Sequence, residues 1–136
     1  MKPHFRGYVF SRPFMGERVP QAVQNLVIRD YCKKKGFEFL LSSTEYAMQA
    51  CHLILEKSIE TISEVDGIAM YSIFQLPEKN DYRKDVCQRV IKLDKQIHFA
   101  CEGLSLSSEN EFEDLETLWM IKKTIPRCPT GLPLLT

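Results

Sequence analysis

The sequence predicts an α/β fold, a three-layer α/β/α sandwich around a mostly parallel sheet of four to five strands. Two observations predict it. Four short apolar runs, rich in β-branched and aromatic residues, alternate with segments whose apolar residues repeat at helical spacing. Each run also ends in a group of polar and aromatic side chains, or in a cysteine and a carboxylate. Because helical crossovers make successive strands parallel, these polar ends should meet at one rim of the sheet, where ligands bind in such folds.

The first unit is a strand over Phe5–Phe10 followed by a helix that Pro20 can open, since a proline at the first helical position loses no hydrogen bond. Gly36 is expected to end this helix, after three lysines that complement its dipole. Its buried stripe is predicted to hold Val23, Leu26, Val27 and Tyr31.

The second unit is a strand over Phe37–Leu41 and a long helix capped by Ser43 or Thr44. The inner face of this helix is predicted to hold Ala47, Cys51, Ile54, Leu55, Ile59 and Ile62.

A third strand, Gly67–Tyr71, is apolar enough to be central. A loop over Gln75–Asp81 leads to a helix whose inward residues are predicted to be Val86, Val90 and Leu93. The fourth strand is Ile97–Cys101, and Leu104–Leu106 can add a short edge strand of either direction. Ser108 and Glu111 fit a capping box before a closing helix, whose buried residues are predicted to be Phe112, Leu115 and Trp119.

The length of 136 residues fits one domain, which we place at residues 1–125, with a proline-rich tail over 126–136. Eighteen basic residues balance eighteen acidic ones, which gives no general electrostatic reason to bind nucleic acid or a membrane surface. The start of the chain has no apolar signal segment, so we expect a cytoplasmic protein. The five cysteines form no C-x-x-C pair, and we expect neither a disulfide framework nor a metal site. The sequence indicates no particular cofactor.

The loop after the first strand carries Ser11, Arg12 and Arg18, and Gln21 lies in the first turn of the next helix. Arginine forks and free N–H groups at a helix N-terminus suit a phosphate or a carboxylate. The loop lacks the glycine pattern of a dinucleotide site or a P-loop, and surface or structural ion pairs are the competing interpretation of both arginines. Their position at the rim favours an anionic ligand.

Glu45 and Glu102 follow two strands whose ends the predicted sheet can bring together, which makes them candidates for a general acid and base. We group Ser11 with them as a candidate catalytic residue. A carboxylate at a helix start is, however, favoured by the helix dipole without any catalytic role. Further candidates for binding a substrate's hydroxyls are Tyr46, Ser72 and Gln75.

The three histidines show no metal-ligand spacing, and His98 within a strand suits a buried imidazole. A Cys51 nucleophile activated by His52 is a weaker hypothesis, because neighbouring positions of a helix point in different directions. Cys51 is more typical of a small apolar core residue.

Four blocks of this sequence resemble the signature blocks of the sporadic carbohydrate cluster proteins. They are RGYVFSRPF over 6–14, PQAVQNLVIRDYC over 20–32, STEYAM over 43–48 and YSIFQLP over 71–77. That family is encoded in bacterial gene clusters for surface carbohydrate or lipopolysaccharide synthesis. The resemblance implies a biological setting and no particular reaction.

A more distant resemblance is to the catalytic domain of resolvase-type serine recombinases, which implies a resolvase-like or flavodoxin-like fold. Where a recombinase has Tyr-x-Arg-x-Ser, this chain has Tyr8–Arg12, with Phe10 in place of the arginine and Arg12 in place of the serine. Where it has Asp-Arg-Leu-x-Arg, this chain has Phe74–Glu78, without either arginine. Strand cleavage needs that cationic clamp, so we do not expect recombinase activity.

Two functions are the main hypotheses, and residual nucleic-acid processing is a third that depends on the distant fold resemblance alone. The first is a carbohydrate-biosynthesis protein that acts on or binds a sugar, a sugar nucleotide or another small anionic metabolite at the rim. The second is a non-catalytic partner of a pathway enzyme that forms homo-oligomers through its C-terminal helix, because Leu118 and Met120 fall off the buried stripe of that helix.

Overall fold

Five strands form a single sheet in the order β2-β1-β3-β4-β5 within residues 2–14 and 16–124, which the computed structural model describes. The strands are β1 (His4–Phe10), β2 (Glu38–Glu45), β3 (Gly67–Met70), β4 (Gln96–Phe99) and β5 (Leu104–Leu106). The first four are parallel to their neighbours, and β5 runs antiparallel to β4. The predicted α/β fold with a mostly parallel sheet is confirmed. The direction of the edge strand at 104–106, which the sequence left undecided, is antiparallel.

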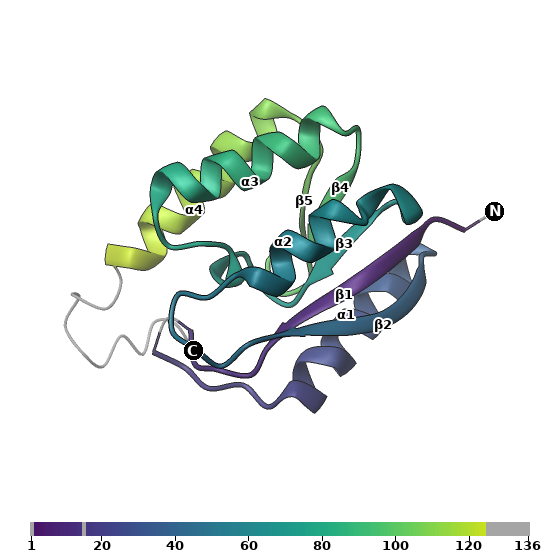
Figure 1. The fold of residues 1–136 in the computed structure, drawn as a ribbon, viewed down its shortest axis with the longest axis horizontal. Coiled ribbons are helices and arrows are strands. Elements are labelled where there is room, and N and C mark those ends of the chain that lie inside the picture. Colours follow the sequence, from purple (N-terminus) through teal and green to yellow (C-terminus); the bar gives the residue numbers. More distant parts are fainter. Residues whose placement is uncertain (1, 15, 125–136) are drawn as a thin grey trace.

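Helices cover both faces of the sheet (Figure 1). They are α1 (Gln21–Lys35), α2 (Leu53–Glu60), α3 (Asn80–Lys92) and α4 (Glu109–Thr124), with short 3-10 turns η1 (Ile62–Glu64) and η2 (Ile73–Gln75). A small core that includes Val9 and Ile28 lies under α1. The larger core, which includes Tyr8, Leu55 and Trp119, joins α2, α3 and α4 to the opposite face. The three layers follow from the alternation of side chains along each strand.

Helix α1 turns a different stripe towards the sheet from the one that its apolar residues predict. Val23 is 42% exposed and Leu26 is 64% exposed, whereas Gln24, Ile28 and Cys32 are buried at a spacing of four residues. The prediction is wrong because the amide of Gln24 binds the backbone of β1, which fixes the rotation of the helix about its axis. The end of α1 is as predicted, with Gly36 at φ 77°.

The second unit also differs from its prediction. Strand β2 continues to Glu45, so Ser43 and Thr44 lie within the strand and cap no helix. Helix α2 begins only at Leu53, and Ala47 and Cys51 belong to the connecting segment. A Ser-Thr-Glu sequence resembles a helix start, but here it extends the edge strand that pairs with β1.

The second half of the chain follows the prediction more closely. All four residues of β3 are buried, as expected for a central strand. Helix α3 buries Val86 and Val90, but Leu93 lies just past its last turn and is 50% exposed. Helix α4 buries the three predicted residues Phe112, Leu115 and Trp119. At its start, Ser108 Oγ accepts from the Glu111 N–H at 3.5 Å, while the Glu111 carboxylate accepts from Ser107 rather than from Ser108.

Two other expectations concern the ends of the molecule. Leu118 is partly buried against the larger core and Met120 is 58% exposed, so the proposed oligomer surface on α4 stays a prediction. The proline-rich tail at 126–136 lies outside the described residues. Among the helices of the described part, none is both long and apolar enough to cross a membrane.

Candidate functional site

At the rim of the sheet, the carboxylate of Glu45, the last residue of β2, lies between β1 and the start of α2. This side chain is 1% exposed. Its Oε1 accepts from the Tyr8 hydroxyl at 2.7 Å and from the Leu55 N–H at 3.1 Å. Its Oε2 accepts from the N–H groups of Ile54 and Tyr46, both at 3.1 Å. Glu45 therefore caps the N-terminus of α2 from a strand eight residues earlier in the sequence.

Opposing effects act on the ionisation of Glu45. Burial acts to raise its pKa, but the hydrogen bonds from Tyr8 and the backbone N–H groups outweigh burial and hold the pKa below its ordinary value. Burial and the same contact raise the pKa of Tyr8 far above its ordinary value. The pair thus consists of an ionised carboxylate and a neutral phenol at neutral pH.

Two buried glutamines connect β1, α1 and η2. Gln24 accepts from the Phe10 N–H at 2.9 Å and donates to the carbonyls of Phe10 and Val19 at 2.9 and 2.8 Å. The Gln75 amide donates to Gln24 Oε1 at 2.7 Å and accepts from the Tyr71 N–H at 3.2 Å. Both residues are 0% exposed, so Gln75, a predicted substrate-binding residue, lies within this network.

Glu102 and Ser72 form a separate group at the other end of the rim. The Glu102 carboxylate accepts from the Ser72 hydroxyl at 2.8 Å and from the Ile73 N–H at 3.0 Å. Burial raises the pKa of Glu102, although these hydrogen bonds act in the opposite direction. The interactions fix the turn η2 that follows β3. Glu102 and Glu45 bind different partners and are not hydrogen-bonded to each other, so the two carboxylates do not form a pair.

The remaining predicted residues take different positions around the end of β1. The Ser11 hydroxyl donates to the Glu45 carbonyl at 3.0 Å. Arg12 donates from Nη1 to the Tyr46 carbonyl at 2.8 Å, and its guanidinium stacks on the Phe10 ring at 4.1 Å from the centroid. The side chains of Arg18, Gln21 and Tyr46 are exposed.

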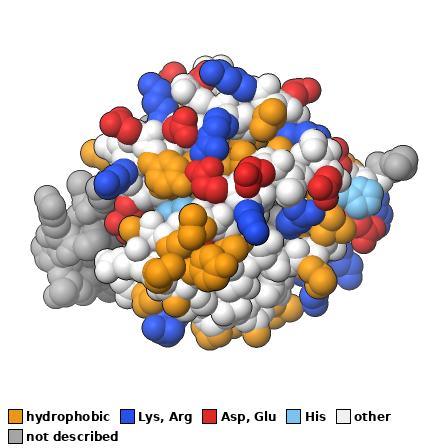
Figure 2. Space-filling view, viewed as in Figure 1, with side chains coloured by type: hydrophobic (Ala, Val, Ile, Leu, Met, Phe, Trp, Pro, Cys, Tyr) orange, Lys and Arg blue, Asp and Glu red, His pale blue; other side chains and the backbone are white. Residues whose placement is uncertain are grey.

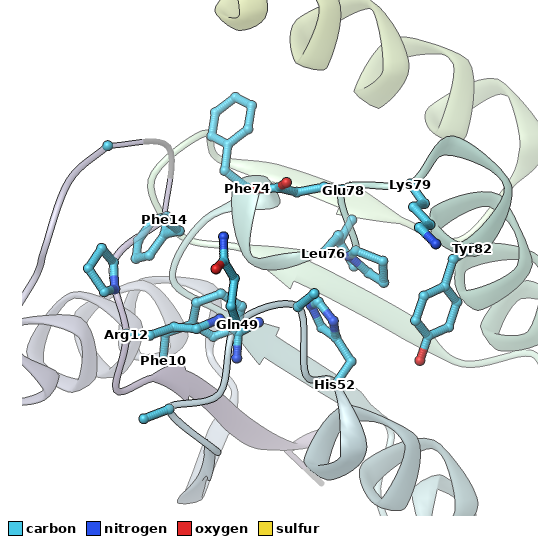
Figure 3. Close-up of a pocket in the computed structure, with 15 residues that line it drawn as sticks. Phe10, Arg12, Phe14, Gln49, His52, Phe74, Leu76, Glu78, Lys79 and Tyr82 are labelled. Atoms are coloured by element: carbon cyan, nitrogen blue, oxygen red, sulfur yellow. The ribbon is translucent and has the colours of Figure 1, made fainter.

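A pocket of about 770 Å³ lies beside this rim, on the face covered by α2 and α3 (Figure 3). Its walls come from three parts of the chain. These are the end of β1 with the loop after it, the segment between β2 and α2, and the stretch from η2 to the first turn of α3. Aromatic side chains and two cations dominate the lining, whose labelled members are Phe10, Arg12, Phe14, Gln49, His52, Phe74, Leu76, Glu78, Lys79 and Tyr82.

His52 is the buried polar residue in this lining, with 7% exposure. Its Nε2 lies 3.1 Å from the Gln75 carbonyl, which can only accept, so Nε2 carries the proton. Burial lowers the pKa of His52, and the charge of Arg12 acts in the same direction. Cys51 is 3.6 Å from Glu45 Oε2 through its sulfur, so the thiol and the imidazole have separate partners and do not form a nucleophile–base pair.

Arg12 is the one predicted site residue among the described lining of this pocket. Glu45, Gln75 and Ser72 lie behind the lining, where they hold the backbone of the rim. Sequence reasoning missed the contributions of Phe14, Gln49, His52, Phe74, Glu78, Lys79 and Tyr82. A signal existed for part of this set, because the Gln75–Asp81 loop follows a central strand and so had to lie at the rim. No group of His, Cys, Asp and Glu suited to a metal ion occurs among the described residues.

Figure 2 shows hydrophobic side chains gathered on the face that α2 and α3 form. Tyr46, Met48 and Leu53, which flank the pocket-lining segment between β2 and α2, are 52%, 61% and 59% exposed. The entrance to the pocket is therefore bordered by apolar as well as charged surface.

The architecture is shared with two solved structures. One is the N-terminal catalytic domain of TP901-1 integrase, with a TM-score of 0.60, 15% sequence identity and coverage of 90% of this chain and 97% of that chain. The other is a resolvase family site-specific recombinase from Streptococcus pneumoniae, with a TM-score of 0.59, 9% identity and coverage of 90% and 91%. The fold is resolvase-like. Similarity at these identities concerns the resolvase-like fold alone.

No family model and no curated protein sequence matches this chain. The resemblance to the sporadic carbohydrate cluster proteins therefore stays a prediction.

Proposed function

We propose that this protein binds a sugar nucleotide, or another small anionic sugar metabolite, in the pocket at the rim of the sheet. The setting would be bacterial surface polysaccharide synthesis, which the resemblance of the sequence blocks implies. The observation that carries the proposal is Arg12, a cation with hydrogen-bond donors to spare that lies in the wall of a pocket of ligand size.

Arg12 is oriented by its neighbours and still has binding capacity. One donor of its guanidinium is used by the Tyr46 carbonyl, and its plane rests on the Phe10 ring. A guanidinium has five N–H donors in a fixed fork, so the remaining donors can bind two oxygens of a phosphate. Among the described residues, none of the ion pairs involves Arg12.

The size and the walls of the pocket suit a ligand with an uncharged body. Small-molecule sites commonly have volumes of about 300–1,000 Å³ and mostly apolar walls with a few polar groups. The pocket of about 770 Å³ falls in this range, and Phe10, Phe14 and Phe74 provide rings against which a base or a sugar can pack.

Binding has more support than catalysis by the predicted carboxylates. Both oxygens of Glu45 are saturated by donors, and a carboxylate with a lowered pKa is a poor general acid at neutral pH. Ser11 donates to a backbone carbonyl, and Glu102 holds the turn η2. Roles of these three residues in catalysis stay predictions.

Calorimetric titration with UDP-glucose tests the proposal. Wild-type protein is expected to bind it, and Arg12→Ala to weaken binding by about tenfold or more, because a charge-assisted hydrogen bond to phosphate is lost. Lys84→Ala is the matched control, since it removes an exposed cation of α3 outside the described pocket lining. Absence of binding at millimolar UDP-glucose, or equal affinity of the Arg12→Ala and wild-type proteins, would contradict the proposal.

A further inference from the structure

The two ends of the pocket differ in charge. Phe10, Arg12 and Phe14 lie together at one side of the cavity, and Glu78, Lys79 and Tyr82 come from the opposite side (Figure 3). A ligand that fills the cavity therefore meets two chemically different environments.

The end at Arg12 carries one uncompensated positive charge. No described carboxylate forms an ion pair with Arg12, and Glu45, the nearest acid in the sheet, is bound by Tyr8 and backbone N–H groups instead. The ring of Phe10 beneath the guanidinium keeps water from one of its faces. This end suits a phosphate.

The opposite end has no net charge, because Glu78 and Lys79 contribute one acid and one base. Both residues are exposed, and none of the ion pairs among the described residues joins them. A carboxylate that accepts and an ammonium that donates match the hydroxyl groups of a sugar, which do both. Because Glu78 offsets the charge of Lys79, this end attracts a phosphate less than the end at Arg12 does.

The backbone that carries this acid and base is held firmly. Arg83, which is 0% exposed, donates from Nη1 to the carbonyls of Pro77 and Glu78 at 3.1 and 3.0 Å. The Tyr82 hydroxyl donates to Glu56 at 2.6 Å, so the tyrosine ring is fixed as a wall of the same end. The backbone at Glu78 is thus fixed by the fold, and its side chain projects from a held segment.

We infer that the pocket binds a phosphorylated sugar in one orientation, with its phosphate at Arg12 and its sugar hydroxyls between Glu78 and Lys79. Glu78 is then the residue that distinguishes a sugar nucleotide from the free nucleotide. This inference rests on the proposed function of the pocket and adds the orientation and the specificity-determining residue.

UDP and UDP-glucose are related probes: they share the uridine and the diphosphate, whereas UDP lacks the glucose and carries one more ionisable oxygen on its terminal phosphate. Wild-type protein is expected to bind UDP-glucose about tenfold more tightly than UDP, as a carboxylate–hydroxyl hydrogen bond allows. Glu78→Gln should reduce this ratio to about two or less and leave the UDP affinity within about twofold. Arg12→Ala should reduce the binding affinities for UDP and for UDP-glucose by the same factor. Glu113→Gln, an exposed acid on α4, is the control and should keep the wild-type ratio.

The outcomes separate the two claims. If wild-type protein binds both probes and Glu78→Gln keeps the wild-type ratio, or weakens UDP and UDP-glucose equally, the orientation is overturned while the proposed binding function stands. Equal wild-type affinities for the two probes overturn the orientation as well. If neither probe binds, the proposed function fails, and the orientation fails with it.

Discussion

Glu45 shows how a single residue can act far from its place in the sequence. It ends an edge strand, yet its carboxylate accepts the N–H groups of Ile54 and Leu55 at the start of α2. The residue that directly precedes α2, His52, makes no side-chain cap, so Glu45 replaces the usual N-cap. The negative charge also meets the positive end of the helix dipole.

The substitution Glu45→Gln is expected to lower the free energy of unfolding by about 3 kcal/mol at pH 7, because it removes an ionised acceptor that is fully bonded. Since the folded pKa is lowered, this stabilisation is present above the ordinary value of 4.5 and is lost as the pH falls through the lower folded pKa. Urea unfolding of both proteins between pH 7 and pH 3 measures the difference.

The control for this comparison is Glu60→Gln, at the exposed last position of α2, which should change stability by about 0.5 kcal/mol or less. If Glu45→Gln behaves like Glu60→Gln, or if the difference between wild type and Glu45→Gln does not shrink in acid, the ionised cap does not stabilise the fold.

Residue roles of this kind were only partly predictable. The polar cluster that now forms the end of β2 was visible in the sequence, and Glu45 within it lies at the rim. The sequence indicated that a helix dipole favours the Glu45 carboxylate, but it could not show that Glu45 reaches α2 from the end of a strand, because capping rules consider only the residues next to a helix. His52 and Lys79 were not recognised as pocket residues for a different reason, because each is a single polar residue that belongs to no motif.

Among the elements, the close packing of adjacent strands restricts which residue can occupy the first position of β3. A Cβ at Gly67, the first residue of β3, would collide with the carbonyl oxygen of Gln96 on the adjacent β4 and lie 2.7 Å from the Phe5 ring. The backbone of β4 cannot move aside without breaking the pairing of the central strands. Glycine is required here by space rather than by its backbone angles.

Gly67→Ala is therefore predicted to destabilise the protein by about 3 kcal/mol, the cost of overpacking a rigid core. Gly36→Ala provides the matched comparison, since Gly36 has a positive φ of 77° but open space around its Cβ, and a cost of about 1 kcal/mol is expected. Thermal and urea unfolding of the two variants give the order. A smaller loss for Gly67→Ala than for Gly36→Ala would contradict the steric argument.

For helix α1, the sequence predicted the existence of the helix but not the face that it turns towards the sheet. Apolar periodicity selected Val23 and Leu26, whereas the sheet face is occupied by Gln24 and Ile28. A buried amide counts as polar in any hydropathy pattern, although here its hydrogen bonds to Phe10 and Val19 satisfy it completely. Strand and helix order remained predictable because it depends on many residues rather than on one.

For the whole molecule, Arg83 connects the pocket wall to the last helix. Its Nε and Nη2 bind Glu116 of α4 at 2.6 and 2.9 Å, and its guanidinium lies 4.0 Å from the centre of the Trp119 ring. The same side chain holds the carbonyls of Pro77 and Glu78 before α3. Removal of Arg83 would leave the partly buried Glu116 carboxylate and these two carbonyls without the donors of this side chain.

Arg83→Met is expected to cost about 3 kcal/mol of unfolding free energy, because the buried guanidinium loses its hydrogen bonds to Glu116 and to the two carbonyls together. The double variant with Glu116→Leu should cost less than the sum of the two single variants, because the unpaired carboxylate is removed as well. Denaturant unfolding of the four proteins measures the coupling.

Arg89→Met is the comparison for this prediction. Arg89 also binds a carboxylate on another helix, Glu56 of α2, but its side chain is 36% exposed. A loss of about 1 kcal/mol or less is expected for such an exposed pair. Equal losses for the Arg83 and Arg89 variants would show that burial does not determine the strength of these bridges.

The hydrogen bonds between Gln24 and Gln75 also have a kinetic consequence. They join β1, α1 and η2 through buried amides, and His52 extends the connection to the segment before α2. These hydrogen bonds make the pocket preorganised, so its walls need little rearrangement when a small molecule binds. Association should then proceed as one exponential whose rate rises in proportion to ligand concentration, without a slower phase of rearrangement.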